Sequence, residues 1–143
     1  MKLYLNPNQT SYLNEIISTT ALTAQKANDG QVAKILSELA RKITPNHSYI
    51  KLKAYEAEYV LDYVEATRAA LDEALVTLAT DEREEKDRLV LKATGMRDEL
   101  ETVSALIRSK GILTQAEKEV EYNRAMNKDI EAAISYAPEI EDV

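Results

Sequence analysis

Cysteine is absent from the sequence, and this excludes disulfide frameworks, zinc sites built on thiolates and thiol nucleophiles. Long apolar runs are absent too, since no stretch approaches the ~18 consecutive apolar residues of a membrane-spanning helix. Residues 1–5 are followed at once by a polar run over residues 6–11, so the chain does not open with a signal peptide. We therefore expect a cytoplasmic protein that has no membrane partner.

Glycine, proline and large aromatic residues are scarce. The 143 residues include three Gly, three Pro, no Phe and no Trp, so that eight Tyr supply all the aromatic side chains. Few Gly and Pro residues leave few turns, and abundant Ala, Leu, Glu, Lys and Arg are typical of long helices. The chain length fits one domain. The sequence thus predicts a single all-α domain over residues 1–143, a helical bundle of about five helices.

Acidic residues outnumber basic ones, and the net charge is −7. Residues 1–46 carry five basic and three acidic groups, whereas residues 114–143 carry three basic and eight acidic groups. Nucleic-acid binding requires clustered Lys and Arg. We therefore expect no nucleic-acid partner, and the acidic carboxyl-terminal region is most simply a solvated surface.

The amino-terminal third has the signals of a helical hairpin. Asn6 followed by Pro7 is a helix N-cap with proline at the first helical position. A first helix should run to about Asn28, and a second should cover about residues 31–43. Helices joined by so short a turn pack antiparallel, which predicts an N-terminal helical hairpin within residues 1–46.

Residues 47–110 contain the most strongly helical part of the chain. Between residues 49 and 79 there is no Gly or Pro, and apolar residues form two sets on nearly opposite sides of a helix. A helix that is apolar on two sides needs packing partners on both. The stripe keeps its phase through the charged run 81–88, so the segment is either one long central helix or a helical hairpin. The matching arm lengths favour a hairpin that bends near residues 80–81, and Gly95 is a second candidate for the break.

A faint internal repeat links residues 2–5 with residues 50–53. Leu3-x-Leu5 matches Ile50-x-Leu52 at an offset of 47 residues. If both short segments are extended, they pair as a minor two-stranded ribbon.

The carboxyl-terminal region predicts one further helix over about residues 112–137. Gly111 ends the preceding helix, and Thr114 with Glu117 forms a capping box for the next one. An apolar stripe follows at helical spacing, and Pro138 stops the helix. Residues 138–143 then form an acidic tail.

Polar and aromatic residues within the apolar stripes are the candidate interface residues. Polar residues in a packing seam often specify register or partner, and Tyr at four-residue spacing suits an interface. Other interpretations stay open: the Arg can extend from the edge of its seam to water, the Asn pair can face solvent, and the tyrosines can belong to the core. The candidates are Tyr55, Tyr59, Tyr63 and Arg68 on the central helix, and Asn123 and Asn127 on the last helix.

Groups capable of catalysis are few. The single histidine, His47, has no nucleophile or orienting partner near it in sequence, and an ordinary turn residue is the simpler interpretation. Glu58, Asp62 and Glu65 share one helical face and could together hold a divalent ion. We prefer to interpret them as a solvated face, so we predict no catalytic residue, no metal ligand and no cofactor.

The spacing Asp62-x-x-Glu65 followed by Glu82-x-x-Glu85 resembles the paired acidic motifs of the MazG-type nucleotide pyrophosphohydrolases. The second motif departs from the Glu-x-x-Asp pattern of that family. The resemblance implies an all-α, metal-dependent nucleotide hydrolase.

Residues 106–117 resemble the helix–Gly–Ile–x–Thr–helix element of SHOCT-type oligomerisation segments, which implies self-association. The whole chain is also similar in character to the small, acidic, cysteine-free helical proteins common in phage genomes. The leading hypothesis is a non-enzymatic assembly or adaptor protein, phage-encoded, that binds itself or another protein in the host cytoplasm or the virion. One alternative is an inhibitor that binds a host protein through its acidic surface, and another is the nucleotide hydrolase.

Overall fold

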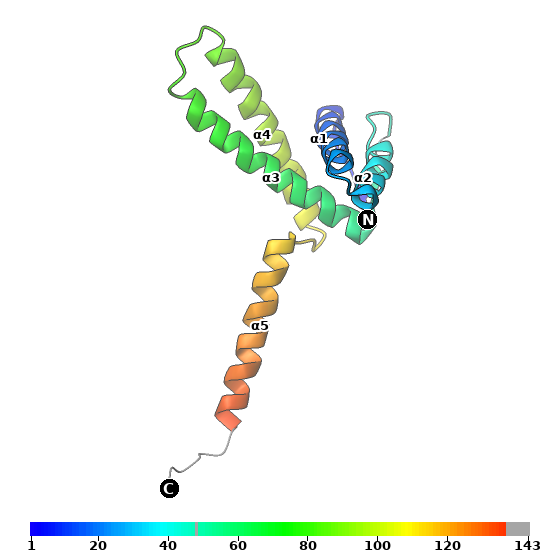
Figure 1. Ribbon diagram of the computed structural model, residues 1–143, viewed down its shortest axis with the longest axis vertical. Coiled ribbons are helices and arrows are strands. Elements are labelled where there is room, and N and C mark those ends of the chain that lie inside the picture. Colours follow the sequence, from blue (N-terminus) through cyan, green and yellow to red (C-terminus); the bar gives the residue numbers. More distant parts are fainter. Residues whose placement is uncertain (48, 137–143) are drawn as a thin grey trace. The chain divides into compact units, whose positions relative to one another are not determined.

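The fold is all-α, as the composition predicts, with five helices in the part of the chain that the structure describes (Figure 1). A computed structural model describes residues 1–47 and 49–136. The chain divides into two compact units, Met1–Ile112 and Leu113–Val143. The elements of the first unit are β1 (Lys2–Leu3), α1 (Pro7–Lys26), α2 (Gly30–Lys42), β2 (Ile50–Lys51), α3 (Ala54–Leu78) and α4 (Lys86–Arg108), and the second unit contains α5 (Gln115–Tyr136). Whether the two units make up one domain over residues 1–143 stays a prediction.

Helices α1 and α2 form the expected antiparallel hairpin. The side chain of Asn6 accepts a hydrogen bond from the Gln9 N–H at 2.8 Å, and the Gln9 side chain accepts one from the Asn6 N–H at 3.0 Å, which caps α1. At the other end, Asn28 takes a left-handed conformation with φ of 61°, a role in which Asn is tolerated. Asp29 then caps α2 through the Val32 N–H, so α2 begins at Gly30, one residue before the predicted start.

Residues 47–110 form a helical hairpin, which decides between the two predicted arrangements. Helices α3 and α4 pack along each other and are joined by residues 79–85. Gly95, the second candidate for the break, lies inside α4. The charged run does not extend α4 backward, because Asp81 accepts hydrogen bonds from the backbone and the guanidinium of Arg83 instead, and α4 begins only at Lys86.

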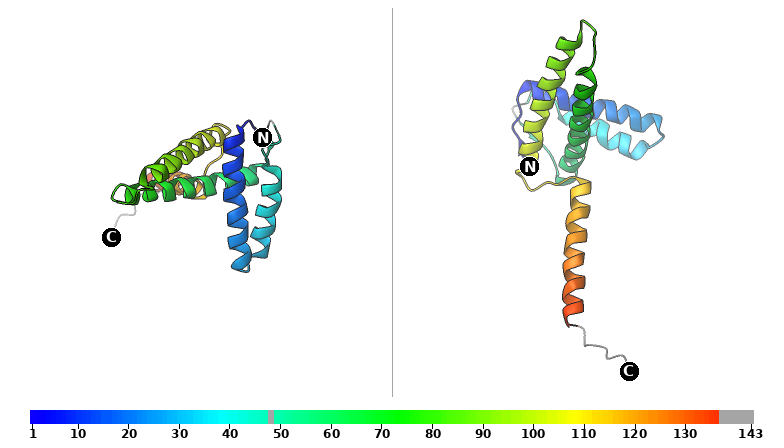
Figure 2. Two further views of the ribbon diagram at one scale, coloured as in Figure 1. Left: turned by 90° about the horizontal axis from the view of Figure 1, so that it is seen from above. Right: turned by 90° about the vertical axis from the view of Figure 1, so that its left-hand side faces the viewer.

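The core of the first unit lies where the two helical hairpins meet. Figure 2 shows the α1–α2 pair lying across α3 rather than alongside it. The fully buried side chains come from both hairpins and from the ribbon, whereas Leu71, Leu75 and Leu78 near the far end of α3 are only half-buried. The largest buried side chains are Leu3, Leu13, Ile17, Leu36, Leu39, Ile43, Leu52, Val60, Leu61, Val64, Leu100 and Ile107.

The predicted two-stranded ribbon is confirmed. Strands β1 and β2 pair antiparallel, with Leu3 opposite Ile50 and Lys2 opposite Lys51. Beyond the strands, the Met1 amino group donates a hydrogen bond to the Leu52 carbonyl at 2.7 Å, and the Leu52 N–H donates one to the Met1 carbonyl at 2.9 Å. The ribbon therefore ties the first residues of the chain to the start of α3.

Candidate functional site

Helix α5 carries an exposed apolar stripe with two asparagines at its centre. Its start is capped as predicted, because the Thr114 hydroxyl accepts the Glu117 N–H at 3.2 Å while the Glu117 carboxylate accepts the Thr114 N–H and O–H. The large apolar side chains are strongly exposed: Val120 by 55%, Ile130 by 51% and Ile134 by 69%. We call the stripe the α5 seam; its members are Ala116, Val120, Asn123, Asn127, Ile130 and Ile134.

Within residues 113–136, no other element of its unit covers the α5 seam. Between residues 113 and 136 that unit consists of one helix, and a helix has no means of burying its own side chain stripe. Seam residues recur at alternating intervals of four and three, which is the heptad spacing of coiled coils. Asn123 and Asn127 lie within this spacing and are exposed, so the arrangement keeps open the predicted role of both in specifying a partner.

The three candidate tyrosines of α3 do not form one exposed ladder. Tyr59 and Tyr63 stack with ring centroids 6.3 Å apart, are half-buried and pack against the core. Burial, with the neighbouring charges of Tyr59, Asp62 and Asp29, raises the pKa of the Tyr63 hydroxyl. Only Tyr55, beside the Lys53 ammonium, is exposed. An interface role for this group is therefore best placed on Tyr55.

Arg68 lies in a polar cluster between α3 and α4. Its guanidinium donates to the Glu65 carboxylate at 2.9 Å, and the same carboxylate accepts the Ser104 hydroxyl and lies 3.7 Å from the Arg108 guanidinium. Burial alone would raise the pKa of Glu65, but the hydrogen bonds from Ser104 and Arg68 and the charges of Arg68 and Arg108 outweigh it and lower the pKa. Arg68 is thus a partner of Glu65 within the hairpin, and an additional contact with another protein stays a prediction.

The carboxylates that resemble a hydrolase motif are not brought together. Glu65 is held by Ser104 and the two arginines, whereas Glu82 and Glu85 lie in the connection after α3. Thirteen helical residues separate Glu65 from the end of α3, about 20 Å at the rise of an α-helix. Within residues 1–47 and 49–136, no three His, Asp or Glu side chains are grouped so that they could hold a metal ion.

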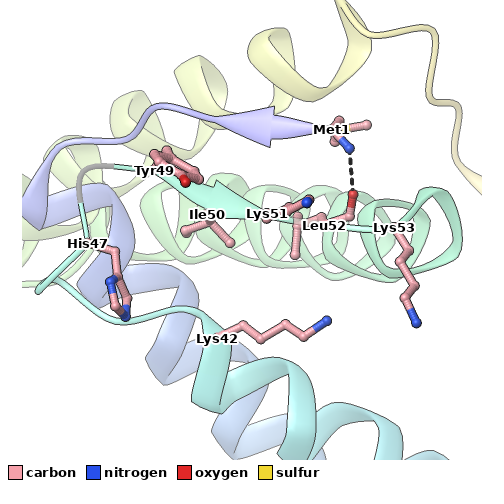
Figure 3. A pocket seen from close by; sticks show the side chains of 8 residues that line it. All are labelled: Met1, Lys42, His47, Tyr49, Ile50, Lys51, Leu52 and Lys53. Carbon is pink, nitrogen blue, oxygen red and sulfur yellow. Dashed lines mark hydrogen bonds between the residues drawn. The ribbon is translucent and has the colours of Figure 1, made fainter.

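A pocket beside the ribbon was not predicted from the sequence. It has a volume of about 620 Å³ and lies between β2, the segment that leads into α3, and the end of α2 (Figure 3). Its wall is rich in cationic side chains, and it includes the single histidine of the chain. We call it the ribbon pocket; its lining residues are Met1, Lys42, His47, Tyr49, Ile50, Lys51, Leu52 and Lys53.

Lys42 forms one wall of the ribbon pocket and is held there by Glu56. The Lys42 ammonium lies 2.9 Å from both carboxylate oxygens of Glu56, which also accepts the Lys53 N–H at 3.0 Å. Burial alone would raise the pKa of Glu56, but these hydrogen bonds and the lysine charges lower it. Lys51 and Lys53 project from the next segment and are exposed.

Comparison of the chain with known protein families, curated proteins and solved structures finds no match. No helix of the described ranges 1–47 and 49–136 has both the length and the apolar character needed to cross a membrane. The α5 seam and the ribbon pocket are therefore the two features of the chain from which a function can be inferred.

Proposed function

We propose that the protein is a non-enzymatic assembly protein that forms a parallel homodimer through the α5 seam. One observation carries this proposal: three large branched apolar side chains and two asparagines follow a heptad spacing on a helix, and no other element within residues 113–136 covers them. A chain without cysteine is compatible with the reducing cytoplasm, where we expect the protein to act. A phage source stays a prediction.

The seam has the composition of a short coiled coil with a polar centre. In heptad terms, Val120, Asn127 and Ile134 occupy a positions, and Ala116, Asn123 and Ile130 occupy d positions. In a parallel dimer each of these residues would face its own copy in the partner subunit. An Asn at an a position typically favours two strands in register, because its amide can pair only with the partner's amide across the seam.

Flanking charges favour the parallel over the antiparallel arrangement. Glu119 and Arg124 occupy successive g and e positions, so a parallel dimer would place Glu119 beside Arg124 of the partner subunit, twice by symmetry. An antiparallel register centred on residue 125 would match the seam equally well, with Val120 opposite Ile130. It would, however, place Arg124 beside Arg124 of the partner subunit and Glu117 beside Glu131 of the partner subunit.

The expected dimer is weak. Burial of Val120, Ile130 and Ile134 from two chains contributes roughly 9–18 kcal/mol, at about 1.5–3 kcal/mol for each side chain. Association costs about 4–15 kcal/mol in lost freedom of motion, and the asparagines add little. The midpoints of the two ranges differ by about 4 kcal/mol, which corresponds to a dissociation constant of about 1 mM, so we expect a micromolar to millimolar dimer.

Sedimentation equilibrium of the full chain, from about 10 to 300 µM, tests the proposal over the concentration range that this affinity requires. We expect a monomer–dimer equilibrium that the double substitution Ile130→Asp and Ile134→Asp abolishes. The matched control is Val76→Asp with Leu91→Asp, which changes two equally exposed apolar side chains (73% and 75%) on the α3–α4 hairpin. A strictly monomeric parent, or loss of the dimer in the control alone, would overturn the proposal.

Cysteines introduced one at a time show whether the two α5 helices of the dimer run parallel or antiparallel, because the chain has no cysteine of its own. A Val120→Cys chain should form a disulfide-linked dimer with itself if the helices are parallel. In the antiparallel register, cross-linking would instead require a mixture of Val120→Cys and Ile130→Cys chains. Preferential mixed cross-linking would refute the parallel arrangement while leaving self-association through the seam in place.

The predicted inhibitor of a host protein is the alternative if the chain is monomeric. It would use the acidic face of α3, where Asp62 and Glu58 are half-buried. Binding of a basic partner that weakens steeply with salt would support this function. The described carboxylates lend no geometric support to the metal-dependent hydrolase.

A further inference from the structure

The outward face of the ribbon gathers lysines and tyrosines that are far apart in sequence. Side chains alternate between the two faces of a strand, so burial of Leu3 and Ile50 sends Lys2 and Lys51 outward, directly opposite each other. The Tyr4 and Tyr49 rings lie 5.8 Å apart, and the Lys2 ammonium lies 4.8 Å from the centre of the Tyr49 ring.

This arrangement is locally unfavourable in the free protein. Like charges directly opposite each other across a strand pair destabilise it, and the contact between the Lys2 ammonium and the Tyr49 ring offsets part of this cost. Here the excess positive charge adjoins the ribbon pocket, whose wall includes Lys51 and Lys53. Lys42 is paired with the Glu56 carboxylate, and the charge of that carboxylate also acts on Lys53.

We propose that the ribbon pocket binds a mononucleotide, whose phosphate lies between Lys51 and Lys53 and whose base packs against Tyr49. The pocket volume of about 620 Å³ lies within the range usual for small-molecule sites. Ammonium groups suit a phosphate, and an exposed aromatic ring suits a nucleobase. Figure 3 shows Tyr49, Lys51 and Lys53 following one another along the segment that lines the pocket, so the aromatic ring and the ammonium groups belong to one continuous stretch of chain.

A small ligand fits the charge distribution better than a nucleic-acid strand. The chain as a whole carries a net charge of −7, so a long polyanion would be repelled by most of the surface. One phosphate group needs only the local excess around the ribbon. The ribbon pocket shares no residue with the α5 seam, and its test does not depend on the oligomeric state.

Isothermal titration calorimetry of the full chain at low salt, with AMP as the probe, tests the site. Inorganic phosphate, adenosine and a short oligothymidylate are titrated in parallel. We expect AMP to bind at least tenfold more tightly than inorganic phosphate, because only AMP engages the aromatic ring as well as the ammonium groups. Equal affinities for AMP and inorganic phosphate, or binding of the oligonucleotide but not of AMP, would overturn the proposal.

Paired variants separate the site from a general effect of charge. Lys51→Ser with Lys53→Ser should weaken AMP binding at least tenfold, whereas Lys34→Ser with Lys92→Ser removes the same charge from α2 and α4 and should leave it unchanged. Equal losses in the two pairs would show an effect of overall charge and refute the site.

The contribution of the Tyr49 ring to AMP binding is tested with a second pair of variants. Tyr49→Ala should weaken binding of AMP but not of inorganic phosphate, and Tyr122→Ala, at an exposed tyrosine of α5, should change neither. Retention of AMP affinity by Tyr49→Ala would refute the packing of the base. Circular dichroism confirms that each variant keeps its helical content.

Discussion

Glu56 should control the acid stability of the first unit, and Glu56→Gln is the substitution that tests this. The carboxylate is only 5% exposed. It joins the end of α2 to the start of α3, since it accepts hydrogen bonds from the Lys42 ammonium and from the Lys53 N–H. A glutamine of the same shape keeps an acceptor for the Lys53 N–H but loses the negative charge. The variant therefore isolates the charged part of the interaction.

The size of the stability loss in Glu56→Gln follows from how deeply Glu56 and Lys42 are buried. A hydrogen bond to a charged group contributes about 1.5–3 kcal/mol when both partners are buried. The Lys42 side chain is 43% exposed, so water screens its charge and the expected loss at pH 7 falls to about 1–2 kcal/mol. For a unit of this size that loss corresponds to a decrease in melting temperature of about 4–10 °C.

The stability loss caused by Glu56→Gln should become smaller as the pH falls. The pKa of Glu56 is lowered in the folded protein, so the folded state binds fewer protons than the unfolded state. Its contribution is complete above the ordinary value of 4.5 and disappears as the pH falls through the lowered pKa. Parent and variant should therefore differ in stability at pH 7 and converge as the pH falls below 4.5 and through the lowered pKa.

Urea unfolding followed by circular dichroism, across this pH range, measures the difference. Glu38→Gln, at an exposed residue of α2, removes the same charge and should change the free energy of unfolding little at any pH. A Glu56→Gln deficit of the same size at pH 7 and at low pH would refute the reasoning, because a loss independent of pH would come from packing rather than from charge.

Three further predictions follow from single contacts. Ser104→Ala should lower the free energy of unfolding in urea by about 1–2 kcal/mol, because Glu65 loses a buried donor, whereas Thr102→Ala on the exposed side of α4 should not. Asn28→Ala should destabilise the α1–α2 turn by about 1 kcal/mol in thermal unfolding, since φ is positive there, whereas Asn28→Gly should be nearly neutral. Lys51→Glu should increase the free energy of unfolding by up to about 1 kcal/mol, seen as a higher melting temperature, because it replaces repulsion from Lys2 with attraction. The same substitution should abolish AMP binding in calorimetry.

Local signals were enough to predict most of the helices. Asn6 with Pro7 and Thr114 with Glu117 are chemical caps whose partners lie within three residues, so the sequence shows each of them complete. The all-α class followed from the same local periodicity. The buried side chains of α3, such as Leu61 and Val64, lie on one of the two apolar sides that the sequence predicted for this helix.

The connection between α3 and α4 shows where local signals fail. Asp81 pairs with Arg83, because the carboxylate can accept from both the backbone and the side chain of an arginine two residues away. Several charged residues in succession offer many alternative pairs of similar energy. Sequence alone could place the bend near residues 80–81, but it could not choose among the pairs that form it.

The ribbon pocket could not be predicted from the sequence, because it depends on pairing between segments 48 residues apart. Neither Lys2 nor Lys51 is unusual in its own segment, and only the antiparallel register places them side by side. That register is set by burial of Leu3 and Ile50 rather than by a tight turn. A shift of β1 by one residue would send Lys2 into the core and Leu3 into water, so the packing that stabilises the ribbon also forces its positive charges onto one outward face.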